Sequence, residues 1–225
     1  LTRRLNGEPL QYIEEYIPFY SIQINVDERC LIPRPETEYL IEIIKNNIDS
    51  PQNILDVGTG TGCIALMLKK IYSESNVDAV DISEQALELA IENAQINDLD
   101  VTFSVSDLLK NVENDKYDII VANLPYIPTE TLQNLDKEVI NYEPMVALDG
   151  GPDGLIYINE LIKQIEERDF NNLTLFLEVD SSHAKTIIKN LKHWKDVKLE
   201  KDLVDRNRYI IAKRWITTSS NCYFK

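Results

Sequence analysis

The chain has 225 residues, of which 44% are hydrophobic and 27% are charged, the ordinary mixture of a soluble globular protein. No apolar run approaches the roughly 20 residues that a membrane-spanning helix needs, so we expect no membrane association. The formal net charge of -15 disfavours direct binding of nucleic acid, because contacts with phosphates usually require a basic surface. A protein substrate or a basic partner fits this charge better.

The chain is poor in residues that form metal sites or disulfide frameworks. Its cysteines and histidines are Cys30, Cys63, Cys222, His183 and His193. Their spacing matches no metal-binding pattern, so we predict that the protein holds no metal. Scattered cysteines fit a reducing compartment, and we expect a cytoplasmic protein. The start of the chain shows no signal-peptide pattern. Because position 1 is Leu1 rather than Met, we expect the chain to be a fragment that lacks an N-terminal segment.

The predicted elements begin with a β-hairpin. Residues 12–26 are expected to form two short strands around Pro18. A proline-rich corner at residues 32–35 follows and leads into a helix over residues 36–48. The apolar positions of this helix recur at helical spacing, so one of its sides should pack against a core.

From residue 53 onward, strand-like and helix-like segments alternate. Strands are predicted at residues 54–57, 77–80, 101–105, 117–122 and 173–179. Helices are predicted at residues 62–72, at 83–96 with Ser83 as N-cap, and at 182–193. Two closing strands, at 197–203 and 208–212, are joined by a tight turn at 205–207. The predicted fold class is α/β, with a doubly wound, mainly parallel seven-stranded sheet, a C-terminal antiparallel hairpin and an N-terminal β-hairpin.

A glycine-rich segment at residues 53–62 follows a predicted strand and opens a helix, which is the setting of a nucleotide-binding loop. Gly58, Gly60 and Gly62 allow backbone angles and close approaches that a Cβ atom would prevent. Their spacing lacks the extra residue of the dinucleotide motif. Asp56 would repel a pyrophosphate, but it suits the ammonium group of an amino-acid-bearing cofactor. The loop therefore favours S-adenosylmethionine over NAD.

Two more acids follow the next two strands. Asp81 ends the second strand, about 20 residues after the loop, where a carboxylate can accept hydrogen bonds from ribose hydroxyls. Asp107 follows the third strand, where a carboxylate can bind the amino group of adenine. A single acid at such a place is more often a solvated turn residue. Three acids at successive strand ends lie along the crevice where open α/β sheets bind ligands, so together they indicate a nucleotide-type cofactor.

The fourth predicted strand is followed by Asn-Leu-Pro-Tyr, residues 123–126. A plain strand-ending turn is one interpretation, because Asn and Pro are turn residues. The alternative is catalytic. An amide or aryl-amino nitrogen is a weak nucleophile, because its lone pair is delocalised. The Asn123 side-chain oxygen and the Leu124 carbonyl can accept its two hydrogens and aim the lone pair at a methyl group. Tyr126 would stack on the planar group, and Pro125 would stiffen the loop.

Taken together, these segments resemble the release factor glutamine methyltransferases. The matching segments are residues 4–13 (RLNGEPLQYI), 31–38 (LIPRPETE), 56–62 (DVGTGTG), 123–126 (NLPY), 142–148 (YEPMVAL) and 151–154. The resemblance implies an enzyme that transfers a methyl group from S-adenosylmethionine to the side-chain nitrogen N5 of the glutamine in the Gly-Gly-Gln motif of peptide chain release factors. It also implies a release factor as partner in translation termination.

The site and the domains follow from the motifs and the resemblance. The expected cofactor residues are Asp56, Gly58, Thr59, Gly60, Thr61, Gly62, Asp81, Ile82, Asp107, Leu108 and Asn123. Asn123, Leu124, Pro125 and Tyr126 are expected to bind the substrate and to act in catalysis. Arg34, Pro35 and Glu178 are further expected substrate residues. Residues 1–30 would be the remnant of a helical N-terminal domain with a linking hairpin, 31–215 the methyltransferase domain and 216–225 a polar tail.

Two departures from the family pattern keep alternatives open. The family loop usually reads Asn-Pro-Pro-Tyr, and this chain has Leu124 at its second position. The same loop resembles that of adenine dimethyltransferases, so an N6-adenine nucleic-acid methyltransferase is one alternative. A methyltransferase-like binding module without turnover is another. Glu178 is followed by Val179 and Asp180, where the family tends to have a glycine, which leaves the role of Glu178 open.

Overall fold

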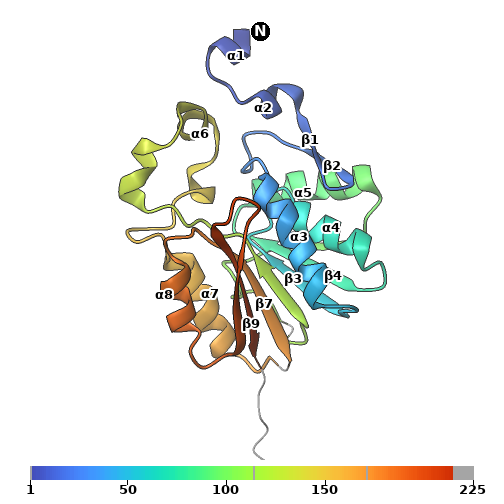
Figure 1. Ribbon diagram of the computed structural model, residues 1–225. Coiled ribbons are helices and arrows are strands. Elements are labelled where there is room, and N and C mark those ends of the chain that lie inside the picture. Colours follow the sequence, from blue (N-terminus) through green and yellow to red (C-terminus); the bar gives the residue numbers. More distant parts are fainter. Residues whose placement is uncertain (1, 114, 171, 215–225) are drawn as a thin grey trace, which may run out of the picture.

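The computed structural model describes residues 2–113, 115–170 and 172–214 (Figure 1). The polar tail expected at 216–225 and Cys222 lie outside the described residues. Among the helices of the described part, none is long and apolar enough to cross a membrane. The division of the chain at residue 30 stays a prediction.

A seven-stranded sheet forms the centre of the molecule, in the order β5-β4-β3-β6-β7-β9-β8. Its strands are β3 (Asn53–Val57), β4 (Asn76–Asp81), β5 (Thr102–Val105), β6 (Ile119–Ala122), β7 (Leu173–Glu178), β8 (Lys195–Lys201) and β9 (Asn207–Arg214). The first five pair in parallel, and β9 runs antiparallel to both β7 and β8. The sequence-based fold class, including the antiparallel C-terminal pair, is confirmed. Every residue of β6 and β7 is buried, as expected for central strands covered on both faces.

Helices cover both faces of the sheet (Figure 1). One face packs against α3 (Pro35–Asn47), α4 (Cys63–Ile71) and α5 (Glu84–Asn97). The other face packs against α7 (Ile156–Glu166) and α8 (Ala184–Asn190). Ser83 caps α5 as predicted, because its hydroxyl accepts a hydrogen bond from the Ala86 N–H at 3.2 Å. The sheet is therefore buried between two layers, and its carboxyl edge is where a site can open.

The N-terminal hairpin is confirmed, but its position differs from the expectation. Its strands are β1 (Tyr16–Phe19) and β2 (Ile22–Asn25), and Pro18 lies within β1 opposite Gln23 rather than between the strands. The prediction of strand from residue 12 is wrong, because Leu10–Glu14 forms the helix α2. This helix follows Pro9 and ends where Glu15 adopts a left-handed conformation, with φ of 67°. A shorter helix, α1 (Thr2–Leu5), precedes it.

The connection between β6 and β7 contains elements that the sequence analysis did not assign. They are the short 3-10 helices η1 (Thr129–Asn134) and η2 (Met145–Ala147), α6 (Lys137–Tyr142) and α7. Near the C-terminus, the tight turn lies at residues 202–205 rather than 205–207, because the Asp205 N–H donates to the Asp202 carbonyl at 3.0 Å, and β9 begins at Asn207. α8 is also shorter than the helix expected at 182–193.

Candidate active site

A pocket opens at the carboxyl ends of β3, β4, β5 and β6, where the sequence analysis expected a ligand crevice. Its wall contains many of the predicted residues: Arg34, Gly58, Thr59, Gly60, Thr61, Asp81, Ile82, Asp107, Leu108, Asn123, Leu124 and Pro125. Five predicted residues lie outside this wall: Pro35, Asp56, Gly62, Tyr126 and Glu178. The fold thus brings the two predicted loops into one pocket and leaves the five other residues outside its wall.

The glycine-rich loop is fixed at its beginning by backbone hydrogen bonds. The N–H groups of Gly58 and Thr59 both donate to the Val80 carbonyl, at 2.8 and 3.0 Å, which holds the loop to the end of β4. Gly58 has φ of 73°, and a Cβ atom there would lie 2.8 Å from Cδ2 of Leu124. Gly60 also has positive φ, but the space around it is open. The first glycine therefore brings the two loops into contact, and the second leaves room for a ligand.

Asp81 ties the loop to the next strand. One of its carboxylate oxygens accepts the Gly60 N–H at 2.9 Å, and the other accepts the Ser83 N–H at 2.9 Å. Burial raises the pKa of Asp81 above its usual value. A carboxylate oxygen can accept more than one hydrogen bond, so both remain able to bind hydroxyl groups of a ligand. Asp107 faces the same pocket and forms an ion pair with Lys110 at 2.5 Å.

Asp56 lies behind the loop rather than in the pocket. It is fully buried, and its Oδ2 accepts hydrogen bonds from the Thr59 hydroxyl at 2.6 Å and the Ala65 N–H at 3.2 Å. Its Oδ1 has no hydrogen-bond partner among the described residues. Burial raises its pKa to about 7. The structure therefore gives Asp56 a supporting role in the glycine-rich loop and does not bring it to the wall that a cofactor would touch.

The Asn-Leu-Pro-Tyr loop leaves the end of β6 and runs along the pocket. Asn123, Leu124 and Pro125 line it, whereas the half-buried Tyr126 packs against the core below. Gly150 supports the loop from the other side, since a Cβ atom there would lie 2.8 Å from the Pro125 carbonyl oxygen and from Cα of Tyr126. Gly154, in the matched segment 151–154, approaches the same loop, since a Cβ atom there would collide with the Tyr126 carbonyl oxygen. Burial raises the pKa of Tyr126 to about 12.

A buried threonine and glutamate lie beside Asn123. The Asn123 Nδ2 donates to the hydroxyl of Thr37 at 3.2 Å, and that hydroxyl donates to Oε2 of Glu178 at 2.9 Å. Glu178 is 2% exposed, and burial raises its pKa to about 7. Thr37 lines the pocket, yet the sequence analysis did not single it out. Its only signal was its place inside the segment 31–38 that carries the resemblance.

Arg34 connects two of the matched segments. Its guanidinium pairs with Glu143 at 2.6 Å, and the second oxygen of Glu143 accepts the Ile32 N–H at 3.2 Å. Glu143 is 5% exposed, so its charge depends on these partners. Arg34 thus lines the pocket while paired with an acid, and Pro35 begins helix α3 behind it. This ion pair and the hydrogen bond from Ile32 join the segments 31–38 and 142–148.

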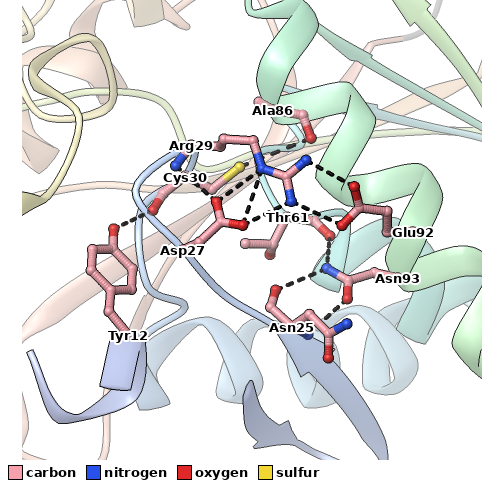
Figure 2. A network of polar contacts seen from close by, with 9 residues as sticks. All are labelled: Tyr12, Asn25, Asp27, Arg29, Cys30, Thr61, Ala86, Glu92 and Asn93. Carbon is pink, nitrogen blue, oxygen red and sulfur yellow. Dashed lines mark hydrogen bonds and ion pairs between the residues drawn. The ribbon is translucent and has the colours of Figure 1, made fainter. Parts of the chain in front are cut away.

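The chain between β2 and α3 forms another wall of the pocket, through Arg29 and Cys30. Figure 2 shows the polar contacts of these two residues. Arg29 pairs with Asp27 at 2.7 Å and with Glu92 on α5 at 2.8 Å. The carbonyl of Cys30 accepts a hydrogen bond from the Tyr12 hydroxyl at 2.6 Å. These contacts fasten the N-terminal segment to the site, and sequence reasoning did not find them.

Asn93 on α5 joins the hairpin to the glycine-rich loop (Figure 2). Its Nδ2 donates to the carbonyls of Asn25, at 3.1 Å, and Thr61, at 3.0 Å. Its Oδ1 accepts the Asn25 N–H at 2.7 Å.

In the described part of the chain, no group of three or more His, Cys, Asp or Glu side chains is arranged to hold a metal ion.

The strand order, the glycine-rich loop after β3 and the Asn-Leu-Pro-Tyr loop after β6 define a methyltransferase. The family model of the methyltransferase small domain matches residues 35–161. A release factor glutamine methyltransferase of Thermodesulfovibrio yellowstonii is 37% identical over 221 residues, which are 95% of this chain and 79% of that protein. The corresponding protein of Lactococcus lactis is 38% identical over 219 residues, with 95% and 80% covered. The chain belongs to the release factor glutamine methyltransferase family.

The fold agrees with solved methyltransferase structures. A methyltransferase of Pyrococcus furiosus superposes with a TM-score of 0.66 at 21% identity, covering 96% of this chain and 98% of that one. At this identity the likeness concerns the fold alone. It supports the seven-stranded architecture independently of the sequence relatives.

Proposed function

We propose that the protein transfers a methyl group from S-adenosylmethionine to the side-chain amide nitrogen of the glutamine in the Gly-Gly-Gln motif of release factors. The observation that carries this proposal is the contact between the two loops. Gly58 of the glycine-rich loop lies against Leu124, so Asn123 faces the same pocket as the open space around Gly60. A methyl donor and an amide acceptor can therefore meet there. The names of the relatives support the substrate.

The residues of the pocket fit S-adenosylmethionine. The open space at Gly60 accepts a ligand that a Cβ atom would obstruct, and Asp81 offers oxygens for ribose hydroxyls. Asp107 and Leu108, which follow β5, are available to an adenine ring. When bound, the cofactor supplies a methyl group on a positively charged sulfur. The protein residues need only bind and orient it, because the donor is reactive by itself.

The Asn-Leu-Pro-Tyr loop supplies what the acceptor needs. The amide nitrogen of glutamine has two hydrogens and a delocalised lone pair. In the proposed complex, the Asn123 Oδ1 and the Leu124 carbonyl accept these hydrogens, which directs the lone pair towards the methyl group. Positioning of this kind lowers the barrier by removing orientational freedom before the reaction. No base is required before attack, because the methylated nitrogen becomes acidic and loses its proton to water.

The charges near Tyr126 argue against the adenine alternative. The charged groups that act on Tyr126 are Glu36, Glu178, Asp180 and Arg208, three acids and one arginine. Arg29 and Arg34, which line the pocket, are both paired with acids. A nucleic acid would bring phosphates to this surface and would meet repulsion rather than a basic patch. A release factor substrate also agrees with the cytoplasmic location expected from the sequence.

A methylation assay tests the proposal. Purified protein is incubated with labelled S-adenosylmethionine and either a full-length release factor or its variant with Gln→Ala in the Gly-Gly-Gln motif. We expect incorporation into the first and none into the second. Equal labelling of both, or labelling of neither, would overturn the proposed function. Titration calorimetry with S-adenosylmethionine, in the same preparation, identifies an inactive binding module by weak or absent cofactor binding.

A further inference from the structure

At the wall of the pocket, three side chains from separate parts of the fold form one chain of hydrogen bonds. Asn123 follows β6, Thr37 lies in the first turn of α3 and Glu178 ends β7. We infer that Thr37 and Glu178 are positioning residues that determine which end of the Asn123 amide faces the pocket. This inference rests on the proposed function, because it assigns the Oδ1 of Asn123 to the substrate amide.

The direction of the hydrogen bonds follows from the number of hydrogens. A threonine hydroxyl has one hydrogen, and an ionised carboxylate has none to donate. The Thr37 hydrogen must therefore go to Oε2 of Glu178, at 2.9 Å. The Thr37 oxygen is then left as an acceptor for the Asn123 Nδ2, at 3.2 Å. Asn123 also lowers the pKa of Glu178 by hydrogen bonding.

The consequence concerns the other end of the Asn123 amide. With its NH2 group bound to Thr37, Asn123 has its Oδ1 turned away from Thr37, and its side chain lines the pocket. The reverse orientation would present NH2 to a substrate NH2, and two donors cannot bond to each other. The hydrogen-bond chain therefore does more than hold Asn123 in place. It selects the acceptor end of the amide for the substrate.

The sheet holds the three residues in register. Ala122 lies opposite Leu177 in the paired strands β6 and β7, so the next residues, Asn123 and Glu178, follow side by side. Thr37 is 3% exposed and covers both from α3. Because each residue is anchored by a regular element, the hydrogen bonds are preorganised before a substrate binds.

The charge of Glu178 determines the direction of the hydrogen bonds between Asn123, Thr37 and Glu178. The titratable and charged groups that act on it come from several elements: Glu36 on α3, Cys63 on α4, Tyr126 after β6, and Arg208 and Tyr209 on β9. Burial raises the pKa of Glu178 to about 7, against the opposing effects of Thr37 and Arg208. Below that pH the acid carries a proton that it can donate to Thr37. The Thr37 hydrogen is then free to bond the Asn123 Oδ1, and the fixed orientation is lost.

The first test compares kinetics of Thr37→Val, which keeps the shape of the side chain but lacks the hydroxyl. We expect kcat for the release factor to fall about 100-fold, the cost of a misplaced group. The KM for the release factor and the calorimetric Kd for S-adenosylmethionine should change less than about threefold. Thr37→Ser should restore most of the rate. Thr186→Val makes the same chemical change at an exposed site on α8 and serves as control. Unchanged kcat in Thr37→Val, with an active wild type, would overturn the inference.

The second test uses pH. In the wild type, log kcat should fall as the pH drops below about 7, because protonated Glu178 no longer fixes the orientation. Glu178→Gln should be slower and should lack this acid limb, whereas the exposed Glu88→Gln on α5 should keep it. An acid limb that persists unchanged in Glu178→Gln contradicts the assignment.

A third measurement needs no substrate, so it separates this inference from the proposed function. The side-chain amide resonances of Asn123, identified by their loss in Asn123→Ala, are followed by NMR against pH. We expect them to titrate near pH 7 in the wild type and to shift much less with pH in Thr37→Val. If the wild type methylates no glutamine but this titration occurs, the function fails and the hydrogen-bond chain stands. If the resonances do not respond to pH in the wild type, the proposed role of the hydrogen-bond chain is wrong.

Discussion

The glycine-rich loop and the Asn-Leu-Pro-Tyr loop share one pocket but are held by different kinds of contact. The first loop is held through its own backbone groups: the N–H groups of Gly58 and Thr59 donate to Val80, and the N–H of Gly60 donates to Asp81. Side chains from distant parts of the sequence, Thr37 and Glu178, hold the second. A loop fixed by its own backbone keeps its shape through many side-chain changes, whereas a loop fixed by buried side chains depends on each of them. The cofactor end of the pocket should therefore tolerate substitutions that the substrate end does not.

The largest expected effect is at the substrate end. Asn123→Ala removes the amide that we assign to the substrate nitrogen. By analogy with the loss of one preorganised hydrogen-bonding group in other enzymes, kcat should fall by about 100- to 1000-fold. Affinity for S-adenosylmethionine, measured by calorimetry, should fall far less, because the glycine-rich loop stays intact. A variant that loses cofactor binding and turnover in equal proportion would show that the two ends of the pocket are not separable.

At the cofactor end, a glycine pair offers a matched comparison. Gly60 and Gly7 both have positive φ, and a Cβ atom at either would meet no protein atom within 4 Å. Gly60→Ala and Gly7→Ala should therefore lose similar stability in thermal unfolding, about 1 kcal/mol. Only Gly60→Ala should weaken binding of S-adenosylmethionine, by about tenfold or more, because its methyl group enters the space left for the ligand. Equal cofactor affinity in both variants would contradict the placement of the cofactor at Gly60.

A smaller effect is expected at Asp56, the buried acid beside the glycine-rich loop, and it concerns how stability depends on pH. Burial raises the pKa of Asp56 in the folded protein to about 7, above its usual value of 3.8, so the folded state binds more protons than the unfolded state between these pH values. Stability therefore falls as the pH rises from about 4 to about 7. Asp56→Asn removes this contribution, at most ~1.4 kcal/mol for each pH unit.

Urea unfolding at several pH values, without cofactor, measures this slope. Glu178 contributes in the same direction, since its pKa is also raised to about 7, so the variant should keep part of the slope. The exposed Asp100→Asn serves as control. An unchanged slope in Asp56→Asn would mean that Asp56 is ionised in the folded protein throughout this range.

The difference between the two loops also explains what the sequence could predict. The glycine-rich loop is local, so its spacing and its place after a strand were enough to predict the pocket wall from Gly58 to Thr61. The sheet was predictable for the same reason, since its strands show buried apolar runs bounded by turn residues. Asn123 was recognisable from its motif, but its orientation depends on Thr37 and Glu178, which lie 86 and 55 positions away along the chain. No pattern of spacing encodes such a contact.

Asp56 and Tyr126 show that a motif alone does not predict which side chains line the pocket. Both belong to recognisable motifs, yet neither lines the pocket. A motif identifies the loop, whereas the direction of each side chain depends on the packing around it. Asp56 turns inward because the Thr59 hydroxyl and the Ala65 N–H offer it partners there.

The helix α2 was missed for a related reason. Its five residues are too few for a periodic pattern, and its end depends on the left-handed conformation of Glu15.

The smallest effect is expected at Leu124, the position where the family loop usually has proline. Leu124 is 4% exposed, and its side chain contacts the glycine-rich loop at Gly58. The group that we assign to the substrate is its backbone carbonyl, which proline also has. Leu124→Pro should therefore change kcat by less than about threefold, while the added restraint on φ stiffens the loop. Leu124→Ala, which keeps the carbonyl but loses the contact with Gly58, is the matched comparison. Both variants lose the leucine side chain that touches Gly58, so both should weaken cofactor binding, whereas only Leu124→Pro also restricts φ. A large loss of kcat in Leu124→Pro with normal cofactor affinity would show that the substrate end needs the backbone conformation that leucine allows.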